Sequence, residues 1–459
     1  MIHVTRNAPA AAENPHVALG YLQLESLAMM ISVFLIAMSL GACRHPAKEP
    51  VTLTFLDPQW AHDLTEHNVR PDVRLQEFTR QKGIQVKHLP APETALDQLS
   101  LAKELLRKGA SSPDVTGVDV IWSGTLSDDL IDLKPYFANE LSSIDPDVVA
   151  SFTVNGKLVA VPYQPDIGVL FYRKDLLREY GYSAPPRTWD QLEKMATRIQ
   201  QGERAKGRKD FWGFVWPGAA GEGLTCNALE WQVGEGGGHI IEADNTISVN
   251  NPDAIRSWQR AAHWIGRISS PKVTSYEEWD AIYTYYLGNA AFYRGWAQSY
   301  FRKVQDNPSD AGWIGITDVP GGKAGHAATL GGFGLGVSQS SAHRIEAVEL
   351  VRSLIGREVQ SESARSHSEP SNGSELYKRL AILKEYSDSA DMGGGVVSRP
   401  SSVAKEKYAE VAHAYIRAVH SVLEGKTRAP ETAAGLEREL VGITGFKTEP
   451  PSRVRDPKD

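Results

Sequence analysis

The sequence predicts an α/β fold with two domains, and two observations support this. The first is length, because 459 residues are enough for two domains of ordinary size. The second is an alternation of strand-like and helix-like segments: a strand pattern over 51–55, a helical pattern over 73–78, a short strand over 84–86 and a second helix over 96–106. Strands that alternate with helices pair in parallel and are covered by those helices, which is an α/β layer.

Local signals predict several later elements. A buried strand is expected over 118–121, and Asn155-Gly156 between two apolar runs predicts a tight hairpin with a type I′ turn. Thr188–Gln191 has the pattern of a capping box that starts a helix, and Asn251 before a proline predicts another helix start. Residues 206–238 are rich in Gly and Trp and predict loops around a cleft.

The last third of the chain is predicted to be mostly helical. One apolar stripe has Ile345, Val348, Val351 and Ile355, and a second runs from Tyr408 to Val422. Between them, residues 361–374 are rich in Ser and Glu, which predicts an exposed loop.

The N-terminus has the features of an export signal. Leu27–Leu40 is strongly apolar and about 14 residues long, which is too short for a membrane-spanning helix and fits the apolar region of a signal peptide. Leu40-Gly-Ala-Cys43 follows and resembles the lipobox of bacterial lipoproteins, which implies cleavage before Cys43 and lipidation of its thiol, with palmitate as one acyl chain. The preceding region departs from the usual pattern, because it carries Glu13 and Glu25. The alternative is a buried helix that ends at an ordinary cysteine.

Composition and motifs argue against several functions. The formal net charge is −7, so no broad basic surface for nucleic acid is expected. The sequence contains neither a Gly-x-Ser-x-Gly nucleophile motif nor a His-Glu-x-x-His metal motif. We therefore expect no enzyme activity, no metal and no cofactor.

Six segments in order resemble the extracellular solute-binding proteins of ABC importers, in the sugar-binding family that includes maltose- and trehalose-binding proteins. The resemblance covers essentially all of residues 51–446. The segments that carry it are Pro113–Trp122, Gly156–Leu176, Gly213–Trp231, Ala291–Trp296, Leu330–Ser338 and Val397–Tyr415.

The resemblance implies an α/β two-lobe periplasmic-binding-protein fold (type II, maltose-binding-like) with a hinge and an interlobe cleft. Three crossings between the lobes are expected, near Pro162, Thr317 and Ser341. The resulting division is 1–42 signal peptide, 43–50 lipidated tether, 51–161 plus 317–340 N-lobe, 163–316 plus 341–450 C-lobe, and 451–459 tail. The lobes would close around a ligand by hinge motion.

The resemblance also suggests which residues hold a ligand. A sugar has flat CH faces that stack on aromatic rings, and its hydroxyls donate well to ionised carboxylates. Asp119 and Asp166 match two ligand positions of the family, one from each lobe, and Trp296 resembles its stacking tryptophan. Further candidates are Trp122, Trp216, Gly332, Phe333, Trp60 and His62. The alternative roles are capping or solvent exposure for the two carboxylates, and core packing for three of the further candidates, Trp122, Trp216 and Phe333.

The function implied is that of an extracytoplasmic, lipid-anchored protein that captures a neutral di- or oligosaccharide for an ABC permease, as a monomer. Two departures leave the sugar open: Phe333 stands where the family often has Trp, and Ala297-Gln298 follows Trp296 where Pro-Tyr is common. The alternatives are a binding protein for a polyol, a peptide or an anion, or a secreted glycosidase that uses Asp119 and Asp166.

Overall fold

The structure is a computed structural model. It describes residues 51–451 apart from 58–72, 93–94, 110–111, 143, 145 and 356–394. The predicted signal peptide, Cys43, Trp60, His62, the loop at 361–374 and nearly all of the tail therefore lie outside the described residues. Within the described part, no helix is both long and apolar enough to cross a membrane.

The first strands and helices form the predicted α/β layer. In it β1 (Thr52–Leu56) pairs in parallel with β2 (Gln85–Leu89) on one side and β3 (Val115–Asp119) on the other. The helices α3 (Val73–Lys82) and α4 (Ala95–Leu106) connect them. This order of strand and helix was predicted from the period of the apolar residues, and the structure confirms it.

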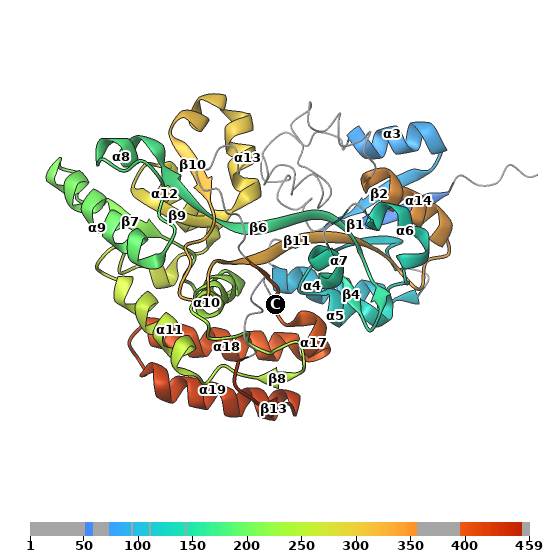
Figure 1. The fold of residues 1–459 in the computed structure, drawn as a ribbon. Helices are drawn as coiled ribbons and strands as arrows, with labels where there is room; N and C mark the ends of the chain where they lie inside the picture. The colour runs from blue at the N-terminus through green and yellow to red at the C-terminus, as the bar shows by residue number, and fades with distance from the viewer. Residues whose placement is uncertain are drawn as a thin grey trace, which may run out of the picture. The chain divides into compact units, whose positions relative to one another are not determined.

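Two long strands carry the sheet from these elements to the rest of the chain. The main sheet has the order β2-β1-β3-β11-β6-β9-β7. The first half of β6 (Val161–Arg173) pairs with β11 (Ala327–Val337), and its second half pairs with β9 (Ala290–Trp296) and with β10 (Ile314–Thr317). The second half of β11 pairs with β3. Figure 1 shows β6 and β11 running side by side through the middle of the molecule.

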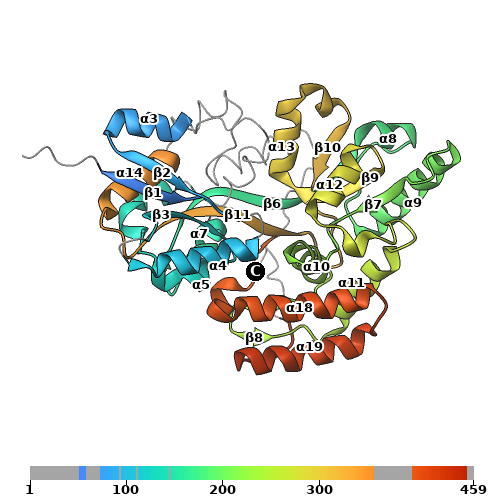
Figure 2. The ribbon, with the colours of Figure 1, turned by 180° about the vertical axis from the view of Figure 1, so that it is seen from behind.

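Helices surround the strands at the β9–β7 end of this sheet, and Figure 2 shows two of them, α18 and α19, next to each other. The elements are α8 (Lys174–Glu179), α9 (Trp189–Ala205), β7 (Trp212–Val215), α10 (Glu222–Gly234), α11 (Pro252–Trp264), α12 (Glu278–Tyr286), α13 (Ala297–Asp306), α18 (Tyr408–Leu423) and α19 (Ala429–Thr444). Their contacts bury a cluster of large aromatic side chains: Trp189, Phe214, Trp216, Trp231 and Trp264.

The predicted turn and helix starts are present. Asn155 and Gly156 have φ angles of 51° and 80°, and they connect β4 (Thr153–Val154) to β5 (Lys157–Leu158). The Asn251 side chain accepts hydrogen bonds from two backbone N–H groups of α11, each at 3.0 Å. These features depend on neighbouring residues alone, which is why the sequence predicts them well.

Residues 206–238 are not a loop region, contrary to the prediction. They contain β7 and the buried helix α10, most of whose side chains are inaccessible to solvent. A helix that is buried on every side lacks the apolar–polar period by which helices are recognised in a sequence.

The third predicted crossing is also wrong. Ser341 donates a hydrogen bond to Asp114 at 2.5 Å, and α14 (Arg344–Ile355) packs against α3, with Lys82 and Glu349 3.1 Å apart. Residues 341–355 therefore stay with the first strands instead of joining the C-lobe. Ile345, the first residue of the predicted apolar stripe, is exposed. An apolar stripe shows that a helix packs, but not on which partner.

The chain reaches α18 through a segment that contacts elements from both ends of the sheet. β12 (Gly395–Val397) pairs with the first residues of β11. Then α17 (Ser401–Ala404) lies against α5 (Ser123–Leu126), where the Ser401 hydroxyl donates to the Val120 carbonyl at 3.0 Å. Because α18 packs on α10 and α11, the chain passes from the elements around β3 to those around β9 and β7 between α17 and α18.

Candidate ligand-binding site

The strand register brings four of the predicted ligand residues to neighbouring strands. Asp119 at the end of β3 is paired with Phe333 of β11, and Asp166 of β6 is paired with Gly331. Trp296, the last residue of β9, is paired with Gly168. Neighbouring strands lie about 4.8 Å apart, so these four strands span roughly 15 Å, about the length of two or three sugar rings.

Asp119 is a partly buried carboxylate at the end of its strand. One oxygen accepts a hydrogen bond from the backbone N–H of Ile121 at 3.1 Å, and Arg399 lies 3.9 Å away. Burial raises the pKa of Asp119 to about 6; Arg399 opposes this shift, whereas Glu222 and Glu278 add to it. Asp119 therefore changes charge within a physiological range of pH.

A buried arginine with two polar partners lies beside Asp119. The Arg399 guanidinium forms an ion pair with Glu222, the first residue of α10, at 3.0 Å. The Tyr408 hydroxyl donates to the same carboxylate at 3.0 Å. A second guanidinium nitrogen of Arg399 lies 3.4 Å from the Leu330 carbonyl. Arg399 therefore supplies one positive charge to a region that also contains the carboxylates of Asp119, Glu222 and Glu278.

Asp166 is held at the start of a helix. One of its oxygens accepts hydrogen bonds from the backbone N–H of Ile167 at 2.8 Å and of Gln298, in the first turn of α13, at 3.2 Å. A carboxylate at a helix N-terminus is stabilised by the unpaired N–H groups there. Asp166 thus has the capping role weighed as its alternative, in a position beside Trp296.

Trp296 is fixed on several sides and remains partly exposed. Its indole nitrogen donates to Glu278, the first residue of α12, at 2.9 Å, and the Arg294 guanidinium lies 4.4 Å from its ring centroid. A methyl group at Gly331 would lie 2.7 Å from the ring, so the absence of a side chain there lets the indole pack on the strand. Such a ring can stack against a ligand without first losing rotational freedom.

A buried ion pair between Arg294 and Glu230 packs against the Trp296 ring. Arg294 and Glu230 are almost inaccessible to solvent and make two hydrogen bonds, at 2.6 and 3.0 Å. The Glu230 carboxylate also accepts from the backbone N–H of Thr329 in β11 at 2.9 Å. The pair therefore links the strand that carries Trp296 to the strand on which its ring rests.

Gly332 has a conformation that other residues rarely adopt. Its φ is +93°, and a methyl group at this position would lie 2.0 Å from the Gln164 carbonyl. The backbone distortion puts Phe333, which is partly exposed, edge-on to Trp122 at 6.0 Å between ring centroids. Gly332 thus shapes this part of β11, and Phe333 is the aromatic ring available on the Asp119 side.

Two predicted aromatic residues belong to the core instead. Trp216 is fully buried, donates from its indole nitrogen to Ser269 at 3.1 Å and packs edge-on against Trp231. Trp122 is buried behind Phe333. Neither ring therefore has a surface to offer a ligand: the prediction that Trp122 and Trp216 bind the ligand is wrong, and core packing is their role.

Three charged residues at this place were missed by the sequence analysis: Glu222, Glu278 and Arg399. Arg399 lies inside the segment Val397–Tyr415 that carried the family resemblance, and this was a signal that could have identified it. Glu222 and Glu278 are first residues of their helices, where acidic side chains are common for capping reasons alone. Nothing local distinguishes them from ordinary helix starts.

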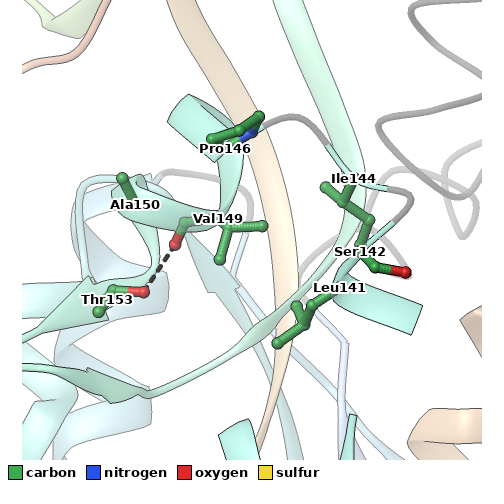
Figure 3. Close-up of a pocket in the computed structure, with 7 residues that line it drawn as sticks. All are labelled: Leu141, Ser142, Ile144, Pro146, Val149, Ala150 and Thr153. Carbon is green, nitrogen blue, oxygen red and sulfur yellow. Dashed lines mark hydrogen bonds between the residues drawn. The ribbon is translucent and has the colours of Figure 1, made fainter. Parts of the chain in front are cut away.

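A pocket lies elsewhere, at α6 (Ala138–Leu141) and α7 (Pro146–Ser151). Its volume is about 550 Å³, and it is lined by Leu141, Ser142, Ile144, Pro146, Val149, Ala150 and Thr153 (Figure 3). The Thr153 hydroxyl is already bonded to the Val149 carbonyl at 2.8 Å. Among the described residues that line this pocket, none is charged and none is a predicted ligand residue.

Groups of three or more His, Cys, Asp or Glu side chains suited to a metal ion are not found in the described part of the chain.

The profile of the bacterial extracellular solute-binding proteins matches residues 71–361, which is more than half of the sequence. The chain belongs to this family.

Its relatives agree with this assignment. A probable ABC transporter-binding protein of Deinococcus radiodurans is 38% identical over 400 residues, covering 86% of this chain and 94% of that protein. This solute-binding protein is therefore the solute-binding component of an ABC importer and acts outside the cytoplasm. The family consists of binding proteins, so the chain is not an enzyme.

Solved structures show the same fold. The T. maritima protein MalE3, solved with maltose bound, has 30% sequence identity and a TM-score of 0.72, covering 86% of this chain and all of that one. MalE from Xanthomonas citri, at 22% identity, has a TM-score of 0.65 over 86% of this chain and 98% of the other. These similarities confirm the predicted mixed α/β periplasmic-binding-protein fold.

Proposed function

We propose that this solute-binding protein captures a neutral di- or oligosaccharide at the place where β3, β11, β6 and β9 bring Asp119, Phe333, Asp166 and Trp296 together. The observation that carries the proposal is that Trp296 is fixed in position and yet partly exposed. It is a partly exposed aromatic ring, fixed by Arg294 and Gly331, with the Asp166 carboxylate on the adjacent strand β6 and Asp119 further along the same sheet. Rigid aromatic faces beside ionised acceptors suit a ring of CH groups edged with hydroxyls.

The balance of charge favours a neutral ligand over an anion. Arg399 is paired with Glu222, and Arg294 is paired with Glu230. Asp119 and Glu278 add negative charge, so an anion would meet repulsion without an uncommitted arginine to bind it. The T. maritima relative that was solved with maltose is consistent with a saccharide ligand.

In this proposal β6 and β11 form the hinge. Both strands pair with elements at each end of the sheet, so a change in their twist would move Asp119 relative to Trp296. Such a motion would enclose a sugar between the two predicted lobes and present the closed form to the permease.

The proposal includes a lipid anchor at Cys43, after removal of residues 1–42. It rests on the Leu40–Cys43 sequence and the apolar run before it. Metabolic labelling with a palmitate analogue should mark the wild-type protein and not the Cys43→Ser variant. Equal labelling of both would refute the anchor at this residue.

The ligand class is tested by a thermal-shift screen of the mature protein with mono-, di- and trisaccharides, polyols, peptides and anions. A ligand at 100 times its Kd stabilises the folded state by about 2.7 kcal/mol, which gives a measurable rise in Tm. We expect a shift with at least one neutral di- or trisaccharide and none with anions. Shifts confined to peptides or anions would overturn the sugar assignment.

A further inference from the structure

Helix α12 carries two large aromatic side chains on its exposed surface. Trp279 and Tyr283 are 55% and 56% exposed, and their rings are stacked, with centroids 5.9 Å apart and planes inclined by 28°. They are four residues apart and so lie on one face of the helix. The helix is anchored by Ala281, Ile282 and Tyr285, which are buried. Folding therefore gives no reason for two stacked rings in water, whereas exposed apolar groups of this kind often mark a binding surface.

The pair is connected to the proposed sugar site by its neighbour in the sequence. Glu278, the residue before Trp279, accepts the hydrogen bond from the Trp296 indole at 2.9 Å. The first turn of α12, which carries Trp279, is therefore in contact with the residue proposed to stack on the ligand.

The direction in which Trp279 faces follows from Tyr286. Seven residues bring a helix almost back to the same face, so Tyr286 marks the side of α12 that Trp279 shares. The Tyr286 hydroxyl donates to the Ser299 carbonyl of α13 at 3.0 Å, and Lys303 lies 5.0 Å from its ring. Because α13 starts directly after Trp296, this side of α12 contacts, at its Tyr286 end, the helix that follows the proposed stacking residue.

We propose that Trp279 and Tyr283 form an outer platform on which a third or later ring of a bound oligosaccharide stacks. This inference rests on the proposed function and extends it, because it makes the ligand longer than a disaccharide. The flat CH face of a sugar matches an aromatic surface in the same way at both places. Glu277 and Asp280, which cap this helix, make the surroundings acidic, and this disfavours anionic partners such as a phosphate group or an acidic peptide.

The test compares the mature chain with the double variant W279A/Y283A and with L287A as a control. Leu287 is 74% exposed, directly follows the last residue of this helix and has no aromatic ring. Each protein is titrated calorimetrically with α-1,4-, α-1,6- and β-1,4-linked glucose oligomers of two to six units. We expect affinity for the disaccharide of the preferred series to be the same in all three proteins. For four to six units, W279A/Y283A should bind about tenfold more weakly than wild type and L287A should not.

Three results would overturn the platform. They are equal affinity of wild type and W279A/Y283A for the longer oligomers, an equal loss at every chain length, and normal binding with lost transport in membrane vesicles that contain the permease. The last would make this face a permease-docking surface. In each case the wild-type protein still binds the disaccharide, so the proposed function stands. If wild type binds no saccharide at all, the proposed function fails and the platform fails with it.

Discussion

Two buried arginines support the proposed site from its two sides, and they do so differently. Arg294 and Glu230, beside Trp296, are 1% and 0% exposed and make two hydrogen bonds with each other. On the Asp119 side, Arg399 is 5% exposed but its partner Glu222 is 23% exposed and shares its carboxylate with the Tyr408 hydroxyl. The first pair is a closed unit, whereas the second borders the space that a ligand would enter.

The difference separates two tasks. A closed, fully buried ion pair is costly to desolvate and has no charge left to offer, so its role is to hold Trp296 and the adjoining strands in one geometry. A pair at the edge of the site keeps hydrogen-bonding capacity for a ligand and sets the charge state of its neighbours. The raised pKa of Asp119, with Arg399 opposing the shift and Glu222 adding to it, reflects this second role.

The largest effect is expected from breaking the closed pair. R294M should lower the free energy of unfolding by about 3–5 kcal/mol, because it leaves Glu230 charged and buried without its partner. R399M should cost less, since Glu222 is partly exposed and keeps the Tyr408 hydroxyl. Urea denaturation of both variants checks this order. The double variant R294M/E230M should recover most of the loss; equal costs for R294M and R399M would contradict the comparison.

Two tryptophans should respond in opposite ways. W216A should lower the free energy of unfolding by about 3–5 kcal/mol, as expected for a fully buried aromatic ring. W296A should cost much less in stability but weaken saccharide binding by about 30-fold or more, as for an exposed anchor residue. Denaturation and titration calorimetry on the same two variants give both numbers. A collapse of stability in W296A would mean that this ring belongs to the core.

A smaller effect is expected from G332A. The side chain would have to adopt a φ near +93° and would meet the Gln164 carbonyl. A strained backbone of this kind costs about 1–3 kcal/mol. Thermal unfolding of G332A, with G435A at a partly buried position of α19 as the control, checks the prediction, because an added methyl group at Gly435 has only a flexible side-chain end near it. Equal Tm values for the two variants would show that β11 relaxes freely.

The smallest effect is a pH dependence. With the pKa of Asp119 at about 6, its carboxylate is mostly ionised at pH 7 and mostly protonated at pH 5. Affinity for a neutral saccharide should fall by up to about tenfold over that interval, because the ionised acceptor is lost. Calorimetric titrations of wild type and D119N across this range measure it, and an identical slope in both would exclude Asp119 as the source.

The same carboxyl affects stability with the opposite sign. Its folded-state pKa is raised, so between about pH 4 and 6 the folded protein binds more protons than the unfolded chain. This residue therefore makes the folded state less stable as pH rises through that window. D119N should remove that part of the pH dependence of unfolding.

The sequence was most informative where structure depends on adjacent residues. The Asn155-Gly156 turn, the Asn251 cap and the strand–helix alternation from β1 to β3 all have local causes. The family segments were equally useful for the paired strands β6 and β11, since they placed Asp166 and Phe333 on strands that turn out to be neighbours.

What the sequence could not show depends on partners far along the chain. Glu222 and Arg399 are 177 residues apart, and Arg294 and Glu230 are 64 apart, so neither pair has a local signature. Trp216 directly follows β7 and Trp296 is the last residue of β9, both in motifs with glycine, yet only the fold decides that one is enclosed by other rings and the other is left partly open. Burial on all sides also hid α10, which has no polar face.

The central claim is that a saccharide stacks on Trp296 while Asp119 accepts its hydroxyl hydrogen bonds. The most direct measurement is a crystal structure of the mature protein with the saccharide that raises its Tm most. The account predicts a sugar ring parallel to the Trp296 indole, with a hydroxyl within about 3 Å of a carboxylate oxygen of Asp119. A ligand bound away from both residues, for example in the apolar pocket between α6 and α7, would contradict it.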